Sequence, residues 1–338
     1  MRVIIHAGIH KTGSSSIQDT FSAHTPDGFA YAPWRIANHA GLMTLFAEPK
    51  PEKSRPFCNA KDPLKAVAAA QAEWLPKLRE MCSATGPHHT VIFSAERVFA
   101  MPLRVKQNLH AFFAELCDEV RVIAYIRPPA SKAASSVQQV LKGFDIDVRL
   151  ASRWPKYQRR VEALDTSFGR ENVELVPFRR DALKDGDVVA DFAHRIGANL
   201  NPNDIINSNE SMSLEAMAFL YAQRRFGDGM AKAEAGWRPR NEALVAKITT
   251  LGSRKVTFSP EYLEKMSAEH RSDVEWMERR LGASLAETPH PDGLTEVTDL
   301  IEIALQNADL LRQLTDQDLG QMTTIEQVAA AVDVIRLG

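Results

Sequence analysis

A lysine, two glycines and a run of serines lie close together in the stretch RVIIHAGIHKTGSSSIQ, residues 2–18. Its pattern predicts a buried strand, a turn of small residues and then a helix, an arrangement that can hold a phosphate group. Gly8 and Gly13 have the spacing of a nucleoside-triphosphate loop, but Lys11 lies before the second glycine instead of after it. Besides free helix amides, the donors that we expect around the anion are Lys11 and the hydroxyls of Ser14, Ser15 and Ser16.

A second strand–turn–helix stretch, RVIAYIRPPASKAASSVQQ, covers residues 121–139. Arg127 is predicted at the carboxyl end of the strand, and Ser135 follows eight residues later on the helix. Arginine offers a planar fork that suits a phosphate, and serine can add a hydrogen bond. Two phosphate sites at the carboxyl ends of neighbouring strands suit one nucleotide with a 5′ and a 3′ group. The alternatives are a turn with a solvated lysine in the first stretch and solvent-facing side chains in the second.

The two stretches together resemble the sulfotransferase superfamily that uses 3′-phosphoadenosine 5′-phosphosulfate (PAPS), most closely its bacterial and carbohydrate-type branches. In that family a loop of the type Lys-Ser/Thr-Gly-Thr/Ser-Thr/Ser holds the 5′-phosphosulfate, and a later arginine and serine hold the 3′-phosphate. The matching residues here are Lys11, Thr12, Gly13, Ser14 and Ser15, with Arg127 and Ser135. The resemblance covers roughly residues 1–200. His10 replaces the proline that the family usually has before the lysine, and the Arg-Lys-Gly signature of the cytosolic branch is missing.

The resemblance implies transfer of a sulfuryl group from PAPS to a hydroxyl of a carbohydrate or small metabolite, by in-line displacement. The product would be PAP, and no metal is needed. Lys11 would stabilise the leaving phosphate oxygen, and residues 12–16 would bind the 5′-phosphate. A Gly-Arg loop contacts the nucleotide in the heparan branch, so Ser253 and Arg254 in LGSRKVTFSP (residues 251–260) are further candidates, with an ordinary inter-helix turn as the alternative.

Three residues are candidates for the base that takes the proton of the acceptor hydroxyl. Glu96 ends VIFSAE at the predicted carboxyl edge of the sheet, where related enzymes have Ser-x-Glu. It is alternatively a helix-capping or salt-bridged carboxylate. His10 is next to Lys11, and His39 lies in ANHAG; each could instead be a structural or surface histidine.

The predicted elements that would position these residues alternate between strands and helices. Short β-rich apolar runs at residues 3–6, 90–93, 120–126 and 173–176 predict strands, and helical patterns at residues 14–23, 63–81, 103–116, 130–142 and 154–168 lie between them. This alternation predicts an α/β fold, a P-loop-like three-layer α/β/α sandwich with a mainly parallel central sheet. We therefore expect a PAPS-binding core at residues 1–210 and a helical C-terminal extension at residues 211–338.

The C-terminal part is predicted to be helical, at residues 211–226, 241–251 and 259–281, with Ser259 and Pro260 as a helix start. Residues 299–314 have an amphipathic pattern, which predicts docking on the body of the protein or on a second subunit, so a homodimer is possible. The acceptor pocket is expected from residues 29–61 and from the helices after residue 211.

Composition limits the partners. A net charge of −2 over 338 residues argues against a nucleic-acid binder, and no apolar run reaches the roughly 18 residues that cross a membrane. Three cysteines without CxxC spacing fit a reducing compartment, and the histidines at positions 6 and 10 interrupt any signal peptide, so we expect a cytoplasmic protein. Two alternatives stay open: a magnesium-dependent nucleotide kinase of related fold, and a catalytically inactive nucleotide-binding protein.

Overall fold

The computed structural model describes residues 1–9, 12–55, 57–84, 89–143, 154–208, 212–228 and 237–337. His10, Lys11 and the predicted helix start at residue 211 lie outside these ranges. The chain forms two compact units. Unit 1 comprises Met1–Pro128, Lys156–Asn209 and Ser272–Leu285, and unit 2 comprises Pro129–Pro155, Glu210–Arg271 and Ala286–Gly338. The chain thus passes between the units several times, not only at the boundary expected near residue 210.

Unit 1 contains a five-stranded sheet in the order β2-β3-β1-β4-β5, with every neighbouring pair parallel. The strands are β1 (Arg2–His6), β2 (Phe29–Tyr31), β3 (Thr90–Ser94), β4 (Glu119–Ile126) and β5 (Val173–Pro177). The predicted α/β class with a parallel sheet is confirmed, and so are the predicted strands. β2 was missed because its three residues carry too short a pattern, and it lies at the sheet edge beside β3.

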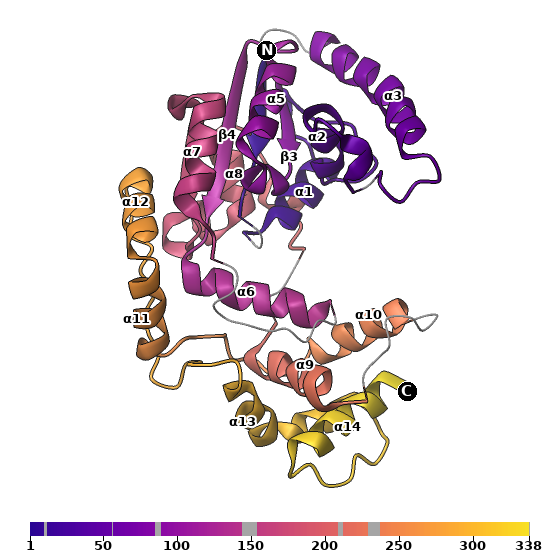
Figure 1. Ribbon diagram of the computed structural model, residues 1–338, viewed down its shortest axis with the longest axis vertical. Helices are drawn as coiled ribbons and strands as arrows, with labels where there is room; N and C mark the ends of the chain where they lie inside the picture. Colours follow the sequence, from indigo (N-terminus) through magenta and orange to yellow (C-terminus); the bar gives the residue numbers. More distant parts are fainter. Residues whose placement is uncertain are drawn as a thin grey trace. The chain divides into compact units, whose positions relative to one another are not determined.

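Helices cover both faces of this sheet (Figure 1). On one face, α1 (Ser14–Ala23) and α8 (Val188–Ile196) pack on alternate strand residues such as Ile4 and Ile123. The helices that build the opposite layer are α2 (Ala40–Ala47), α4 (Arg97–Ala100), α5 (Leu103–Ala114) and α7 (Tyr157–Phe168). Further helices of unit 1 are α3 (Pro63–Ala84) and α12 (Arg271–Leu281). The layers agree with the predicted three-layer sandwich.

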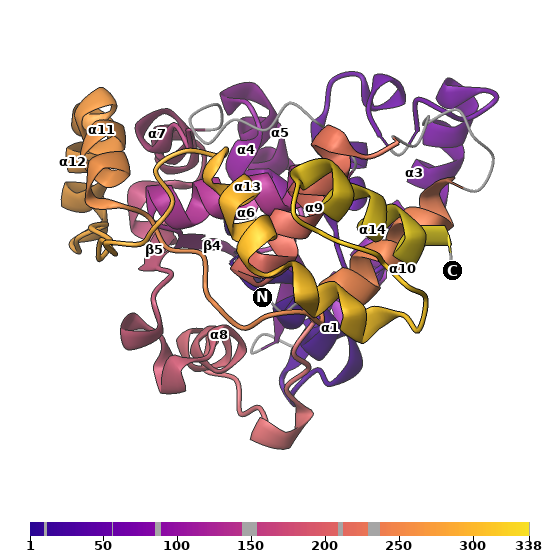
Figure 2. The same ribbon diagram turned by 90° about the horizontal axis from the view of Figure 1, so that it is seen from below.

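Unit 2 is built around α9 (Leu214–Phe226), which is buried on all sides from its first residue to Arg224. Such a helix needs neighbours on every face. These neighbours are α6 (Pro129–Lys142), α10 (Trp237–Ile248), α13 (Asp299–Gln306) and α14 (Ile325–Leu337), as Figure 2 shows. The unit also contains α11 (Pro260–Glu269).

The helix predicted at residues 259–281 is two helices, α11 and α12, separated at His270. The predicted start is confirmed, because the Ser259 side chain accepts from the amide of Tyr262 at 3.1 Å and Pro260 is the first helical residue. The break follows from tertiary contacts. Asp273 at the start of α12 accepts from the amides of Tyr157 and Gln158 in α7, so α12 packs within unit 1.

The amphipathic stretch at residues 299–314 forms α13 followed by a 3-10 helix, Ala308–Leu314. Its buried residues Leu300 and Ala304 pack in the core of unit 2 with α9. The amphipathic pattern is therefore explained by docking on the body of the protein, and the homodimer stays a prediction. No helix in the described ranges is both long and apolar enough to cross a membrane.

Candidate functional site

The carboxyl edge of the sheet in unit 1 brings together three predicted site elements. β1 lies between β3 and β4, and His6 at its end is paired in register with Ser94 of β3 and Ile123 of β4. Glu96 follows the end of β3 by two residues, and Arg127 follows β4 directly. The loop after β1 is thus flanked by a carboxylate on one side and a guanidinium on the other, at the edge where parallel α/β sheets bind ligands.

The loop after β1 is held by backbone bonds to β4. The amides of Ala7 and Ile9 donate to the carbonyls of Ile123 and Tyr125 at 2.9 and 3.1 Å. The Thr12 hydroxyl donates to the Ile9 carbonyl at 2.7 Å, so this predicted ligand donor is used inside the loop. Among the described residues, no side chain caps the start of α1. The first amides of that helix therefore face the loop without a capping acceptor, which favours an anion there.

Neighbouring atoms leave no room for a side chain at either glycine of the loop. Gly13 has a φ of 71°, and a Cβ on it would lie 2.5 Å from Cγ1 of Val188 in α8. A Cβ on Gly8 would lie 2.4 Å from the Thr12 hydroxyl oxygen, 3.4 Å from Nε2 of His6 and 3.6 Å from Oγ of Ser14. The imidazole and the serine hydroxyl therefore converge on the face of Gly8 that carries no side chain.

Three buried polar atoms of β1 and α1 have no hydrogen-bond partner among the residues that the structure describes: Nε2 of His6, Oγ of Ser14 and Nε2 of Gln18. Ser14 and Gln18 are one helical turn apart and share a face of α1. Buried polar groups in folded proteins are almost always hydrogen-bonded. We define these three side chains and Gly8 as the polar cradle, a candidate binding site in which His6 and Ser14 converge on Gly8 and Gln18 lies one helical turn after Ser14.

The sequence interpretation missed two members of the cradle, His6 and Gln18. His6 is fully buried, and its Nδ1 lies 2.7 Å from the Ser94 hydroxyl oxygen. Burial lowers the pKa of His6 to about 4, against a smaller opposite effect of the Glu96 carboxylate, so the ring is neutral at neutral pH. A usable signal was present: His6 is a polar residue at the end of an otherwise apolar strand, two residues before the first glycine of the loop.

His39, predicted as a candidate base, has both ring nitrogens engaged. Its Nε2 lies 2.8 Å from the Ala32 carbonyl oxygen, and its Nδ1 accepts from the Ser94 amide at 2.8 Å. Nε2 therefore carries the proton and donates it to Ala32. Burial lowers the pKa of His39 to about 4. This geometry ties the segment before α2 to the end of β3, and no ring nitrogen is left to accept the proton of an acceptor.

Glu96 is half-buried at the start of α4, and its side chain makes no capping hydrogen bond to that helix. Arg127 is also half-buried; the Tyr157 hydroxyl donates to its carbonyl at 2.6 Å, and its guanidinium carbon lies 5.8 Å from the Phe178 ring centre. Both charged groups thus lie at the loop's edge of the sheet. Ser15 is half-exposed, and the Ser16 hydroxyl accepts from the Ser208 amide at 3.0 Å.

The other predicted nucleotide contacts belong to unit 2. Ser135 is buried in α6, and Ser253 is exposed in the turn before α11. Nε of Arg254 donates to Glu215 in the first turn of α9 at 2.6 Å, and the Arg254 carbonyl accepts from the Leu214 amide at 2.8 Å. Arg254 thus attaches the turn before α11 to the start of α9. All three nucleotide-contact assignments stay predictions.

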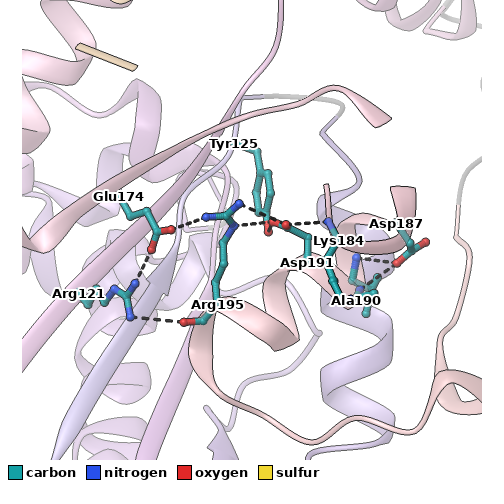
Figure 3. A network of polar contacts seen from close by, with 9 residues as sticks. Arg121, Tyr125, Glu174, Lys184, Asp187, Ala190, Asp191 and Arg195 are labelled. Carbon is teal, nitrogen blue, oxygen red and sulfur yellow. Dashed lines mark hydrogen bonds and ion pairs between the residues drawn. The ribbon is translucent and has the colours of Figure 1, made fainter. Parts of the chain in front are cut away.

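A second polar cluster of unit 1, the α8 network, joins α8 to β4 and β5 (Figure 3). We define it as Arg121, Tyr125, Glu174, Asp191 and Arg195. Arg195 bonds Glu174 at 2.5 Å and Asp191 at 2.6 Å, and Arg121 also pairs with Glu174. Asp191 accepts in addition from the Tyr125 hydroxyl at 2.9 Å.

The α8 network fixes α8 on strands β4 and β5. The start of α8 is capped by Asp187, which accepts from the amides of Val189 and Ala190 at 2.8 and 3.0 Å. The capped end presents Val188 to Gly13. Val188, the first residue of α8, therefore lies against the point where the loop turns into α1.

No protein-family model and no curated protein sequence matches this chain. Among solved structures it is similar to a sulfotransferase from Alicyclobacillus acidocaldarius, with 14% sequence identity and a TM-score of 0.44. The similarity covers 83% of this chain and 96% of that one. A likeness of this extent does not assign an activity, and the case for function rests on the residues at the carboxyl edge of the sheet.

Proposed function

We propose that this chain is a sulfotransferase that moves a sulfuryl group from PAPS to a hydroxyl of a carbohydrate or small metabolite. The observation that carries the proposal is the polar cradle, where the unpartnered Nε2 of His6 and Oγ of Ser14 converge on Gly8 and the unpartnered Gln18 amide follows one turn along α1. The position of Lys11 before Gly13, and Arg127 after the neighbouring strand, favour a phosphosulfate over a nucleoside triphosphate.

The cradle fits an anionic oxygen group. A buried polar atom without a partner costs about 1–3 kcal/mol, so a ligand that bonds it recovers this free energy. The Ser14 hydroxyl and the Gln18 amide nitrogen are donors. His6 becomes a third donor when the Ser94 hydroxyl donates to Nδ1, because the proton of the neutral ring is then on Nε2. With the first amides of α1, these groups would hold the 5′-phosphate.

PAPS supplies a sulfuryl group that is already activated by its bond to phosphate. Glu96 takes the proton of the acceptor hydroxyl as the acceptor oxygen bonds to sulfur and the bond from sulfur to the phosphate oxygen breaks. Lys11 balances the negative charge that develops on that phosphate oxygen. His10 remains an alternative contact on the acceptor side, and His39 is not assigned as the base because its ring nitrogens are engaged.

Arg127 is assigned to the 3′-phosphate, with Ser135 as the partner predicted from the sequence. The test is calorimetric titration of the protein with PAP, AMP and ATP, each with and without magnesium. Magnesium-independent binding of PAP in preference to AMP is expected. A preference for ATP with magnesium would contradict the proposal and favour the kinase. PAP binding without turnover of any hydroxyl acceptor would favour the inactive nucleotide-binding protein.

The variant Arg127→Ala sharpens this test. Removal of a charged phosphate contact costs about 1.5–3 kcal/mol, so PAP should bind about 10- to 150-fold more weakly while AMP, which lacks the 3′-phosphate, changes little. The matched control is Arg170→Ala, which removes the same charge from an exposed residue. Arg170 precedes β5 and therefore lies at the amino ends of the strands, away from the candidate site. Equal losses for PAP and AMP would place Arg127 elsewhere.

A further inference from the structure

Arg127, the residue assigned to the 3′-phosphate, lies where the chain leaves the sheet. The Ile126 carbonyl before it accepts from the Phe178 amide at 2.8 Å, and β4 ends there. Pro128 and Pro129 follow, and proline has no amide hydrogen, so the next two residues cannot hold the chain by amide bonds. Contacts from outside the sheet must therefore help to fix Arg127.

One such contact comes from Tyr157, the first residue of α7. Its hydroxyl donates to the Arg127 carbonyl at 2.6 Å, and the tyrosine is fully buried. Because a peptide unit is planar, this bond fixes the plane between Arg127 and Pro128. The bond thereby limits the directions in which the Arg127 side chain can leave the backbone.

Tyr157 is itself held by α12, a segment far away in the sequence. Asp273 accepts from the amides of Tyr157 and Gln158 at 2.9 and 2.8 Å. A carboxylate at this end of a helix satisfies free amides and complements the helix dipole. Lys156, just before the helix, has a left-handed backbone with a φ of 54°, which is unfavourable for a residue with a side chain. The cap from α12 thus stabilises a helix start that the local backbone does not favour.

The other end of α12 is anchored to α7 and to β5. Both carboxylate oxygens of Asp165, near the end of α7, accept from Arg280 at 2.8 Å. Arg280 also donates to the Val173 carbonyl, at the start of β5, at 3.0 Å. Asp273 and Arg280 are about two helical turns apart, so α12 clamps α7 along its length. All these residues belong to unit 1.

We propose that Tyr157 and Asp273 are positioning residues for the 3′-phosphate site. We define the path from Asp273 through Tyr157 to the Arg127 carbonyl as the α12 relay. The relay holds Arg127 in the orientation that receives the phosphate, so less conformational freedom is lost when PAP binds. This inference rests on the proposed function. It extends the nucleotide site to α12, which lies outside the stretch 1–200 that carries the family resemblance.

The test is calorimetric titration of the full chain with PAP and AMP in Tyr157→Phe, which removes only the hydroxyl. PAP should bind about 3- to 10-fold more weakly, as expected for one hydrogen bond, whereas AMP should change less than about twofold. The matched control is Tyr125→Phe, another fully buried tyrosine of unit 1, whose hydroxyl donates to Asp191 at 2.9 Å. It should lose similar stability in urea and keep the ratio of PAP to AMP affinity.

A double-mutant cycle tests whether Tyr157 acts through Arg127. In an Arg127→Ala background, Tyr157→Phe should cause no further loss of PAP affinity, because the side chain that it orients is gone. Asp273→Ala should weaken PAP selectively, as Tyr157→Phe does. Glu275→Ala removes an exposed carboxylate from the same helix and should leave PAP binding unchanged.

The outcomes separate the relay from the proposed function. Equal losses for PAP and AMP in Tyr157→Phe, or the same loss of PAP affinity with and without Arg127, would overturn the relay. If Arg127→Ala weakens PAP selectively and Tyr157→Phe does not, the role of Arg127 stands and the relay alone fails. If Arg127→Ala affects PAP and AMP equally, the assignment of Arg127 fails and the relay fails with it.

Discussion

Two polar clusters lie on the same side of the sheet in unit 1 and differ in how their groups are satisfied. In the α8 network, Asp191 accepts from Arg195, Tyr125 and the Lys184 amide, and Glu174 accepts from Arg195 and Arg121. In the polar cradle, His6, Ser14 and Gln18 each keep a buried atom without a partner in the described chain. Since unsatisfied burial is costly, we assign the first cluster to the scaffold and propose the second as a ligand site.

The two buried histidines beside β3, His6 and His39, also differ in whether their polar atoms have hydrogen-bond partners. Burial lowers the pKa of both to about 4. His39 uses both nitrogens within the protein, whereas His6 uses Nδ1 with Ser94 and leaves Nε2 open to the loop. Burial and pKa alone therefore do not separate a structural histidine from a candidate binding residue; the count of satisfied nitrogens does.

The largest loss of stability is expected when the α8 network is disrupted. Asp191→Ala leaves the Arg195 guanidinium without its partner on α8 and removes the acceptor of Tyr125, so the free energy of unfolding should fall by about 3–5 kcal/mol. Urea unfolding measures it. Asp191→Asn, which keeps the shape and one acceptor, is the control and should lose less. A loss below 1 kcal/mol in Asp191→Ala would mean that the network does not stabilise the unit.

Gly13→Ala should be the next most harmful change. The left-handed backbone at this residue costs a non-glycine about 1–2 kcal/mol, and crowding of the new methyl group against Val188 costs about 1–3 kcal/mol more. In a Val188→Ala background the crowding is relieved and only the backbone part should remain. Thermal or urea unfolding of the four proteins in this cycle gives both parts; strict additivity would show that the two residues do not touch.

Acidification should destabilise the protein through its buried neutral histidines. Because the folded pKa of about 4 lies below the unfolded value of 6.5, the unfolded chain binds protons first as the pH falls. At pH 5 each histidine should therefore lower the free energy of unfolding by about 2 kcal/mol relative to neutral pH. Urea unfolding at the two pH values tests this, and His6→Gln should remove about half of the histidine-dependent loss. An unchanged pH dependence in that variant would contradict the neutral, buried state of His6.

The smallest effect on stability is expected at the cradle itself. Ser14→Ala removes a hydroxyl that has no partner in the described chain, so stability should change by less than about 0.5 kcal/mol while PAP binds several-fold more weakly. Ser16→Ala breaks the bond to the Ser208 amide and should show the opposite pattern, with about 1 kcal/mol lost in stability and PAP binding retained. A reversed pattern in the calorimetric and unfolding data would remove Ser14 from the cradle.

Local signals in the sequence were enough for the fold class and the loop. Short apolar runs bounded by polar residues located β1, β3, β4 and β5, and the glycine-serine pattern placed α1 at its observed bounds. The Ser259-Pro260 start of α11 was also predicted, since a cap depends on neighbouring residues only. Strand periodicity, turn glycines and caps act over a few residues, so they can be recognised without knowing what packs against them.

Contacts between distant residues were decided by the tertiary structure. The pairing of β2 with β3, the packing of Val188 on Gly13 and the passage from α11 to α12 each depend on segments far apart in the chain. Which ring nitrogens of the two histidines have partners was decided in the same way. Whether a buried nitrogen finds a partner is determined by the strand register and by the loops that meet at the sheet edge, and no local pattern carries that information.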